Sequence, residues 1–389
     1  MANKICFISN RYPNITDPSS LVFLQQLIWA LTDLGEECTV ICPIPNNLNV
    51  RTNKEIPKKT IERTANGKTI TVYFPRYLSF GQQKVLKWNT AKINEQLFTR
   101  CVENVIKTEN ISVDAFYGHF ISPAGIAAVK MGKKYKKPSF IAYGESTPWS
   151  VYNLGIDYVR KALSDVTGVI AVSSKNKNEL TTLKAVEESK ITVIPNAIDP
   201  NRFYQKNRLN LREKHGIEKN ATIVSFVGQF IKRKGIIQLD NTVDKFDDVY
   251  AMYAGKGKII PKSDKTYFHG PIEPAKLIDF YNISDFFVLP TENEGCSNAI
   301  IEAIACGLPI ISSNLPFNDE ILDETNSIRI DVSDEKQLFD AITLLNEDTE
   351  YRKQLSEGSL KKAKELTIQK RAHKIREFII HQKVEAVKE

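Results

Sequence analysis

Two glutamates in the second half of the 389-residue sequence stand eight positions apart, at Glu294 and Glu302. The apolar pattern between them predicts a helix that begins near Ser297. The first N–H groups of a helix have no acceptor within it, and together with the helix dipole they attract phosphate. The interval spans at most about 12 Å of helix, so one nucleotide sugar could contact both carboxylates. The amides would come from Gly295, Cys296, Ser297 and Asn298.

A basic turn in the segment Val224–Gly235, VSFVGQFIKRKG, is the second candidate. The pattern predicts a buried strand, then a glycine turn, and then Lys232, Arg233 and Lys234. Open α/β sheets bind ligands beyond the carboxyl ends of their strands, and cations at that place would neutralise a diphosphate. The alternative is a solvated basic turn, because Lys and Arg are common on protein surfaces.

The segment around the two glutamates, EGCSNAIIEAIACGLP, resembles the E-x7-E motif of the large retaining glycosyltransferase family numbered four. The resemblance implies that Glu294 holds hydroxyls of the donor sugar, that Glu302 holds the ribose hydroxyls, and that the amides between them meet the diphosphate. The basic turn resembles the family segment F-V-G-R-x-x-x-x-K-G, whose Arg and Lys neutralise the leaving diphosphate. Lys234 matches that Lys, but Gln229 replaces the Arg, and Arg233 or the lysine before it could substitute.

Shorter matches extend this resemblance. IPNAID at 194–199 resembles a family linker, and FHGP at 268–271, which ends at Pro271, resembles the segment whose backbone reads the base. In the first half, DAFYGHF at 114–120 resembles a strand followed by an active-site histidine. That match implies that His119 lies on a loop beyond a strand end, facing the cleft near the donor phosphate. A lone histidine is otherwise commonly structural.

Two further candidates come from the first half. AYGES at 142–146 resembles the family's H-G-S-D stretch and puts Glu145 in or next to the acidic position, on the acceptor or sugar side. In the first βα loop, related enzymes often have glycine where this chain has Ser19 and Ser20. Ser20 is the candidate for a phosphate contact there, and either serine could cap the following helix.

The elements that must position these residues follow from apolar runs alternating with amphipathic stretches, which is typical of βαβ units. The pattern restarts near residue 200. We therefore expect an α/β chain with domains at 1–198 and 199–368 and a C-terminal helix at 369–389 that could cross back to the first domain. The resemblance implies the GT-B fold, in which two Rossmann-like parallel-sheet domains face an interdomain cleft, with C-terminal helices.

The strands that the pattern predicts are defined by residue number. In the first domain they are 5–9, 39–42, 71–74, 115–117, 140–143, 169–172 and 191–194. In the second they are 223–227, 250–254, 267–269, 286–289, 310–312 and 328–330. From Glu350 onward the charged sequence predicts one or two helices and no strand.

Composition is that of an ordinary globular protein, with 42% hydrophobic and 25% charged residues. No apolar run suits a secretory signal or a membrane-spanning helix, so we expect a cytoplasmic protein. The six cysteines lack metal-ligand spacing and are interpreted as buried thiols. No D-x-D occurs, so no metal or other cofactor is implied. The first strand does not lead into G-x-G-x-x-G, which argues against a dehydrogenase.

The net charge of +7 reflects a basic excess in the first half of the chain. Five lysines lie on or just after one predicted helix there. They are Lys130, Lys133, Lys134, Lys136 and Lys137. The cluster could contact an anionic membrane surface, as in a peripheral protein at the inner face of the plasma membrane, or it could be a solvated face. Nucleic acid is disfavoured because aromatic residues do not interleave with the basic ones.

The resemblance implies a retaining hexosyltransferase that moves a sugar from a UDP- or GDP-sugar to a saccharide or lipid-linked saccharide acceptor. Bacterial envelope, capsule or exopolysaccharide synthesis is the implied setting, with Lys234, Glu294 and His119 as catalytic residues. Two other classes stay open. A nucleotide-sugar epimerase can share this fold and needs no acceptor. A catalytically quiet partner subunit is conceivable because of Gln229 and the missing first-loop glycine.

Overall fold

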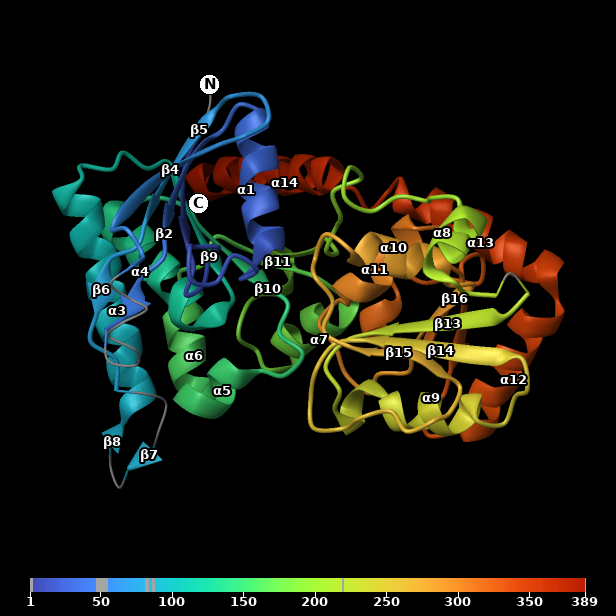
Figure 1. Ribbon diagram of the computed structural model, residues 1–389. Coiled ribbons are helices and arrows are strands. Elements are labelled where there is room, and N and C mark those ends of the chain that lie inside the picture. The colour runs from blue at the N-terminus through green and yellow to red at the C-terminus, as the bar shows by residue number, and fades with distance from the viewer. Residues whose placement is uncertain (1–2, 47–54, 81–83, 86–87, 219, 389) are drawn as a thin grey trace. The chain divides into compact units, whose positions relative to one another are not determined.

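The structure, a computed structural model, describes all residues except 1–2, 47–54, 81–83, 86–87, 219 and 389. The chain divides into two compact units. Unit 1 comprises residues 1–194 and 368–389, and unit 2 comprises residues 195–367. Each unit is built on a largely parallel sheet with helices packed against it, as alternating strands and helices require (Figure 1).

The main sheet of unit 1 has eight strands in the order β12-β11-β10-β9-β1-β2-β5-β4. All neighbours are parallel except β4 and β5, which pair antiparallel. The central strands β9 and β10 are buried along their whole length, which fits their continuous apolar sequences. The strands are β1 (Lys4–Ile8), β2 (Glu37–Ile41), β4 (Lys59–Arg63), β5 (Thr69–Tyr73), β9 (Ala115–His119), β10 (Ser139–Tyr143), β11 (Gly168–Ala171) and β12 (Ile191–Val193).

The helices of unit 1 include the last helix of the chain, α14 (Ile368–Lys388), which packs beside α1 (Val22–Asp33) (Figure 1). Arg376 on α14 donates from Nε to Glu36 at 2.6 Å. The other helices are α3 (Thr90–Thr108), α4 (Ile126–Tyr135), α5 (Trp149–Leu154), α6 (Ile156–Leu163) and α7 (Ser174–Thr182). Two small ribbons pair β3 (Ile44–Pro45) with β6 (Arg76–Tyr77) and β7 (Lys84–Val85) with β8 (Trp88–Asn89).

The sheet of unit 2 has six parallel strands in the order β15-β14-β13-β16-β17-β18. They are β13 (Thr222–Val227), β14 (Val249–Ala254), β15 (Thr266–Gly270), β16 (Phe286–Leu289), β17 (Ile310–Ser313) and β18 (Ser327–Ile330). The helices are α8 (Arg208–His215), α9 (Ile236–Val243), α10 (Leu277–Ile283), α11 (Asn298–Ala305), α12 (Glu335–Glu347) and α13 (Thr349–Ala363). Across both units, no helix of the described ranges is long and apolar enough to cross a bilayer.

Every strand predicted from the sequence is confirmed, with ends that differ by no more than two residues. The prediction missed the two-residue strands β3, β6, β7 and β8, and it missed β4, whose sequence is KTIER. This strand lies at the edge of the sheet and alternates exposed with half-buried residues. It therefore lacks the apolar run that marks the buried strands.

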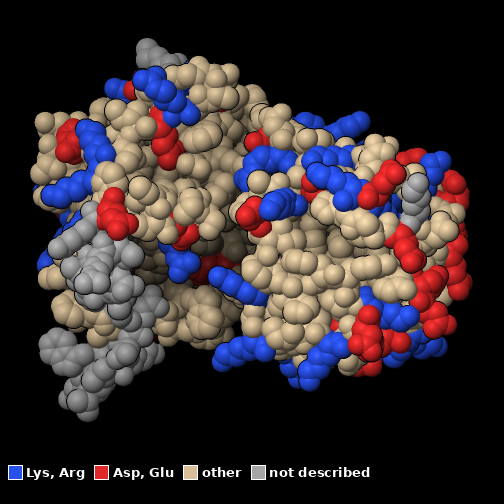
Figure 2. Space-filling view, in the orientation of Figure 1, with Lys and Arg blue, Asp and Glu red and all other residues tan. Residues whose placement is uncertain are grey.

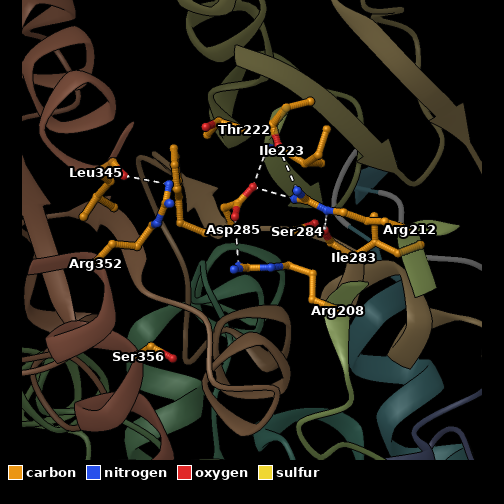
Figure 3. Close-up of polar contacts among 12 residues, drawn as sticks. Arg208, Arg212, Thr222, Ile223, Ile283, Ser284, Asp285, Leu345, Arg352 and Ser356 are labelled. Carbon is orange, nitrogen blue, oxygen red and sulfur yellow. Dashed lines mark hydrogen bonds and ion pairs between the residues drawn. The ribbon is translucent and has the colours of Figure 1, made fainter. Parts of the chain in front are cut away.

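A buried ion pair joins three elements of unit 2 (Figure 3). Asp285, which directly precedes β16, accepts from Arg212 Nη2 at 2.6 Å and from the backbone N–H of Ile223 at 2.7 Å. Arg212 also donates to the carbonyls of Ile283 and Ala221, both at 2.9 Å. The two charged side chains are only 2% and 5% exposed. The pair thus ties α8 to the starts of β13 and β16.

Replacing Arg212 by Met should lower the free energy of unfolding by up to about 3–5 kcal/mol, because the buried Asp285 carboxylate then has only the partly exposed Arg208 as counter-ion. The matched control is Lys214→Met, an exposed position on the same helix. That control should change stability by less than about 0.5 kcal/mol. Urea denaturation followed by circular dichroism measures both. Equal stability of the two variants would show that the pair contributes little.

Candidate functional site

The predicted donor-side residues of unit 2 gather where β13 and β16 end. Lys234 closes a 3-10 turn, Lys232–Lys234, after β13, and Glu294 lies in the loop after β16. The Lys234 ammonium donates to Glu294 Oε1, and both side chains are 13% exposed. Arg233 Nη1 lies 3.7 Å from the same oxygen, and the Thr291 hydroxyl donates to it at 3.1 Å. Two cations and one hydroxyl therefore converge on one carboxylate oxygen.

A glycine brings these two segments together. Gly235 has a φ of 77°, and a Cβ at this position would lie 2.4 Å from the carbonyl oxygen of Pro290, the residue after β16. Only glycine fits both the conformation and the approach. The backbone N–H of Glu292 donates to the Arg233 carbonyl at 2.9 Å, which fixes the turn against the loop.

Helix α11 begins as the sequence predicted. Ser297 is its N-cap and accepts from the N–H of Ile300 at 3.4 Å. Asn196, from the IPNAID linker, donates from Nδ2 to the Cys296 carbonyl at 3.3 Å and to Asn298 Oδ1 at 3.0 Å. The linker therefore braces the loop that leads from Glu294 into the helix. The first amides of α11 have no acceptor within the helix, which makes this end suited to an anion.

Glu302 lies on α11 itself, in a less polar setting than Glu294. The Tyr281 hydroxyl donates to Glu302 Oε2 at 2.9 Å. Burial raises the pKa of Glu302 from 4.5 to about 7, although Tyr281 and Arg202 oppose the rise. Tyr281 was missed as a site residue. The need of a buried carboxyl for a donor could have suggested a tyrosine or a serine nearby, but not which one.

The other two unit 2 candidates lie beyond strand ends at the same edge of the sheet. Gln229 is exposed and follows β13, and Pro271 is exposed and follows β15. Parallel strands end at one edge, so both share that edge with Lys234 and Glu294. The charge missing at Gln229 has a neighbour that could supply it, because Arg233 is close to Glu294 and also donates to the carbonyl of Asn293.

The placement of His119 differs from the expectation. It is the last residue of β9 rather than part of a loop, and it is 5% exposed. Its ring lies 5.4 Å from that of Phe23 and 4.3 Å from that of Phe120. Burial, with a contribution from Arg371 on α14, lowers the pKa of His119 to about 3. The ring is therefore neutral at physiological pH, and neither nitrogen has a hydrogen-bond partner among the described residues.

Glu145 follows β10 in unit 1 and is half-buried. Burial raises its pKa to about 7, and the charge of Glu179 adds to the rise. Its Oε2 has no hydrogen-bond partner in the described part of the chain. Glu179 itself accepts from the Tyr143 hydroxyl. A carboxyl in this state can donate or accept a hydrogen bond near pH 7.

The first-loop serines do not cap the following helix, contrary to the prediction. The N-cap of α1 is Leu21, in the left-handed conformation with a φ of 48°, and no side chain caps the helix. Ser19 donates to Asp17 Oδ1 at 3.2 Å, and the N–H of Ser20 donates to the Asp17 carbonyl at 3.3 Å. The capping prediction is wrong because the loop folds back on Asp17. The Ser20 amide is already used there.

Most lysines of the basic cluster have acidic partners. The nearest N–O distances are 2.8 Å for Lys130–Glu95, 2.9 Å for Lys133–Asp165, 2.6 Å for Lys134–Glu103 and 3.5 Å for Lys137–Asp114. Figure 2 likewise shows acidic and basic side chains interspersed on the visible face of unit 1. The cluster is therefore not a surface of one sign.

Two family models match the chain one after the other. Residues 22–202 match Glycosyltransferase Family 4, and residues 207–362 match Glycosyl transferases group 1. The chain is a glycosyltransferase. It is similar to the putative teichuronic acid biosynthesis glycosyltransferase TuaC of Bacillus subtilis (strain 168), with 27% identity over 356 residues, 87% of this chain and 88% of TuaC. The capsular polysaccharide biosynthesis glycosyltransferase CapM of Staphylococcus aureus is 26% identical over 219 residues, 52% of this chain and 58% of CapM.

Solved structures share the fold of this glycosyltransferase. Sucrose-phosphate synthase from Thermosynechococcus elongatus has a TM-score of 0.77 at 14% identity and covers 99% of this chain and 100% of its own. HepE of Anabaena, solved in complex with UDP, has a TM-score of 0.72 at 15% identity and covers 97% of this chain and 100% of its own. The fold is therefore GT-B, with two Rossmann-like units.

The pKa of Glu302 predicts a pH-dependent stability. A folded-state pKa of about 7, above the ordinary 4.5, means that stability falls as pH rises through this window. The fall attributable to Glu302 is about 3 kcal/mol. Glu302→Gln cannot ionise and escapes this fall. The stability of the variant minus that of the parent should therefore be larger at pH 8 than at pH 5. Denaturation of both proteins at the two pH values measures the gain, with the exposed Glu357→Gln as control. A constant difference between parent and Glu302→Gln would contradict the raised pKa.

Proposed function

We propose that this glycosyltransferase is retaining and moves a hexose from a UDP- or GDP-sugar to a saccharide or lipid-linked saccharide acceptor in cell-surface polysaccharide synthesis. The contact between Lys234 and Glu294 carries the proposal. It puts a cation suited to a diphosphate beside a carboxylate suited to sugar hydroxyls, at the ligand-binding edge of an α/β sheet. TuaC, named for teichuronic acid biosynthesis, CapM, named for capsular polysaccharide biosynthesis, and the UDP complex of HepE support it.

Departure of the nucleoside diphosphate is the step that the unit 2 residues would assist. As the bond from the anomeric carbon to the diphosphate breaks, negative charge grows on the leaving oxygen. The Lys234 ammonium, the Arg233 guanidinium and the amides at the start of α11 would stabilise that charge without a metal. Lys234 would exchange its contact with Glu294 for the diphosphate. Glu294 could then accept hydrogen bonds from the sugar hydroxyls.

Retention would follow from substitution on a single face of the sugar. The acceptor hydroxyl forms the new glycosidic bond on the side from which the diphosphate leaves, and its proton passes to the departing phosphate oxygen. This route needs no protein nucleophile. Glu302 would hold the ribose hydroxyls, and the backbone near Pro271 would contact the base. Ser20 could add only its hydroxyl to the phosphate, because its amide already donates to Asp17.

The acceptor and sugar side of the reaction would fall to His119 and Glu145. His119 is neutral at physiological pH, so it would act through hydrogen bonds rather than through charge. Glu145 has a pKa of about 7 and could form a hydrogen bond with a hydroxyl group of the acceptor. We do not extend the proposal to a membrane contact, since four of the five clustered lysines already have carboxylate partners.

One assay separates this function from its two alternatives. Release of nucleoside diphosphate is measured from a panel of UDP- and GDP-sugars, with and without a lipid-linked saccharide. A transferase releases diphosphate in an acceptor-dependent manner. Conversion of the nucleotide sugar to its epimer without an acceptor would identify an epimerase, and inactivity with every donor and acceptor would favour a partner subunit.

Lys234→Ala should lower turnover at least about 100-fold, the effect of losing one donor to a developing anionic charge. Arg233→Ala should also be harmful if Arg233 supplies the charge missing at Gln229. Steady-state kinetics measures both, and Lys245→Ala, an exposed position after α9, is the control. Unchanged turnover in Lys234→Ala would remove this lysine from the site. A neutral Arg233→Ala would leave Gln229 without a substitute.

The two glutamates should fail differently when changed to Gln. Ribose contacts are equal in the ground and transition states, so Glu302→Gln should mainly raise KM and weaken binding of the product nucleotide. The sugar gains charge during transfer, so Glu294→Gln should lower kcat and leave affinity for the nucleoside diphosphate nearly intact. Calorimetric titration with UDP or GDP, beside steady-state kinetics, measures both. If Glu294→Gln instead loses nucleotide affinity while Glu302→Gln keeps it, the roles assigned to the two glutamates are reversed or wrong.

A further inference from the structure

A cavity of about 480 Å³ lies at the other edge of the unit 2 sheet. It is lined near Asp285 and Pro309, which directly precede β16 and β17, whereas Lys234 and Glu294 follow the C-terminal ends of their strands. Its volume is within the range of about 300–1,000 Å³ typical of small-molecule sites. The cavity is therefore separate from the donor-side residues and large enough for a ligand.

Positive charge dominates the wall of this cavity. The cations that line it are Lys206, Arg208, Arg352 and Lys353. Asp285 is the one carboxylate among the described residues of the lining. Lys206 already has a carboxylate partner outside the lining, because its Nζ lies 2.7 Å from Asp279 Oδ1. The positive charges of Arg208, Arg352 and Lys353 then have only Asp285 in the described lining to neutralise them.

Asp285 cannot neutralise all three. Its Oδ2 is held by the buried Arg212 and by the Ile223 amide, and its Oδ1 lies 2.8 Å from Arg208 Nη1 (Figure 3). Arg212 alone already balances its charge. The Arg208 side chain is 42% exposed, so it retains accessible N–H groups for another anion.

The two cations from α13 have no acidic partner of their own. Arg352 donates to the carbonyl of Leu345 at 3.0 Å, which is an uncharged acceptor (Figure 3). Within the described chain, no carboxylate lies within 4.0 Å of the charged end of Arg352 or Lys353. Burial lowers the pKa of Arg208; the charge of Asp285 opposes this, and the guanidinium groups of Arg212 and Arg352 add to the lowering. Like charges are thus held together around one cavity.

The surrounding groups indicate which anion would fit. Helix α8 begins at the wall with the uncharged N-cap Asn207, so its positive end adds to the potential. Helix α13 also begins there, but the Asp348 carboxylate caps it and offsets its positive end. No aromatic side chain lines the cavity among the described residues, so a nucleotide base would find no ring to stack on. Two exposed polar side chains of the lining, Gln205 and Thr349, could bind sugar hydroxyls. The other amide and hydroxyl side chains there already hydrogen-bond to the protein, and they are Asn207, Asn282, Ser284 and Ser356.

We propose that this cavity binds a small phosphorylated sugar, whose phosphate is held between Arg208 and the two cations of α13, Arg352 and Lys353. Asp285 keeps Arg212 and the Ile223 amide when Arg208 turns to the ligand, so the buried pair stays intact. The site would serve a ligand other than the nucleotide sugar, because it lies at the opposite edge of the sheet.

Calorimetric titration with glucose 6-phosphate tests the site, with glucose as the uncharged control. The cavity variant is Arg352→Gln with Lys353→Gln, and the matched control is Lys361→Gln with Lys364→Gln near the other end of α13. Affinity should fall about tenfold or more for each phosphate-binding cation removed. The parent, the control pair and Lys234→Ala should bind alike. Thermal melting checks that the cavity variant is folded.

Other outcomes overturn the proposal. Absence of binding to the parent at millimolar glucose 6-phosphate refutes it directly. Loss of binding in Lys234→Ala would assign the ligand to the donor side. Equal loss of affinity in the cavity variant and in the control pair would indicate unspecific attraction to positive charge. If the parent instead sediments with phosphatidic acid vesicles through Arg352 and Lys353 but ignores glucose 6-phosphate, the phosphate belongs to a lipid and not to a free sugar.

Discussion

The Asp285 carboxylate is the constraint on which the donor-side arrangement depends. It binds the amide of Ile223 at the start of β13 and Arg212 on α8, and it directly precedes β16. The two strands therefore pair in one register. A slip by one residue would shift one strand by about 3.3 Å and turn its side chains to the opposite faces. The turn that carries Lys234 and the loop that carries Glu294 could then no longer meet.

A second constraint acts at the other end of the same strands. Gly235 lets the turn after β13 approach the backbone of Pro290, and the approach places Lys234 and Glu294 in contact. Each charge is largely removed from water and compensates the other. The pair holds the two segments together in the structure. In the proposed reaction, the diphosphate would replace Glu294 as the partner of Lys234, and the sugar hydroxyls would donate to Glu294.

Much of this arrangement could be predicted because it is encoded locally. The buried strands, the start of α11 at Ser297 and the turn at Lys234 each depend on a few neighbouring residues. Two of the failures depend on distant contacts. The pairing of Glu302 with Tyr281 and the burial of His119 at the end of β9 are set by tertiary packing, which no sequence window contains. The missed cap of α1 is a local failure, because the two serines bond to nearby Asp17 instead.

The ionisable candidates for the site divide into two kinds. Lys234 and Glu294 form a charged pair, whereas burial moves the pKa values of His119, Glu145 and Glu302 toward the neutral form. In the proposed reaction, full charge is useful where the diphosphate would leave, because there the transition state itself gains charge. Hydroxyl groups of a ribose or an acceptor gain none before they react. A nearly neutral buried group can exchange hydrogen bonds with them without the larger cost of desolvating a fixed charge.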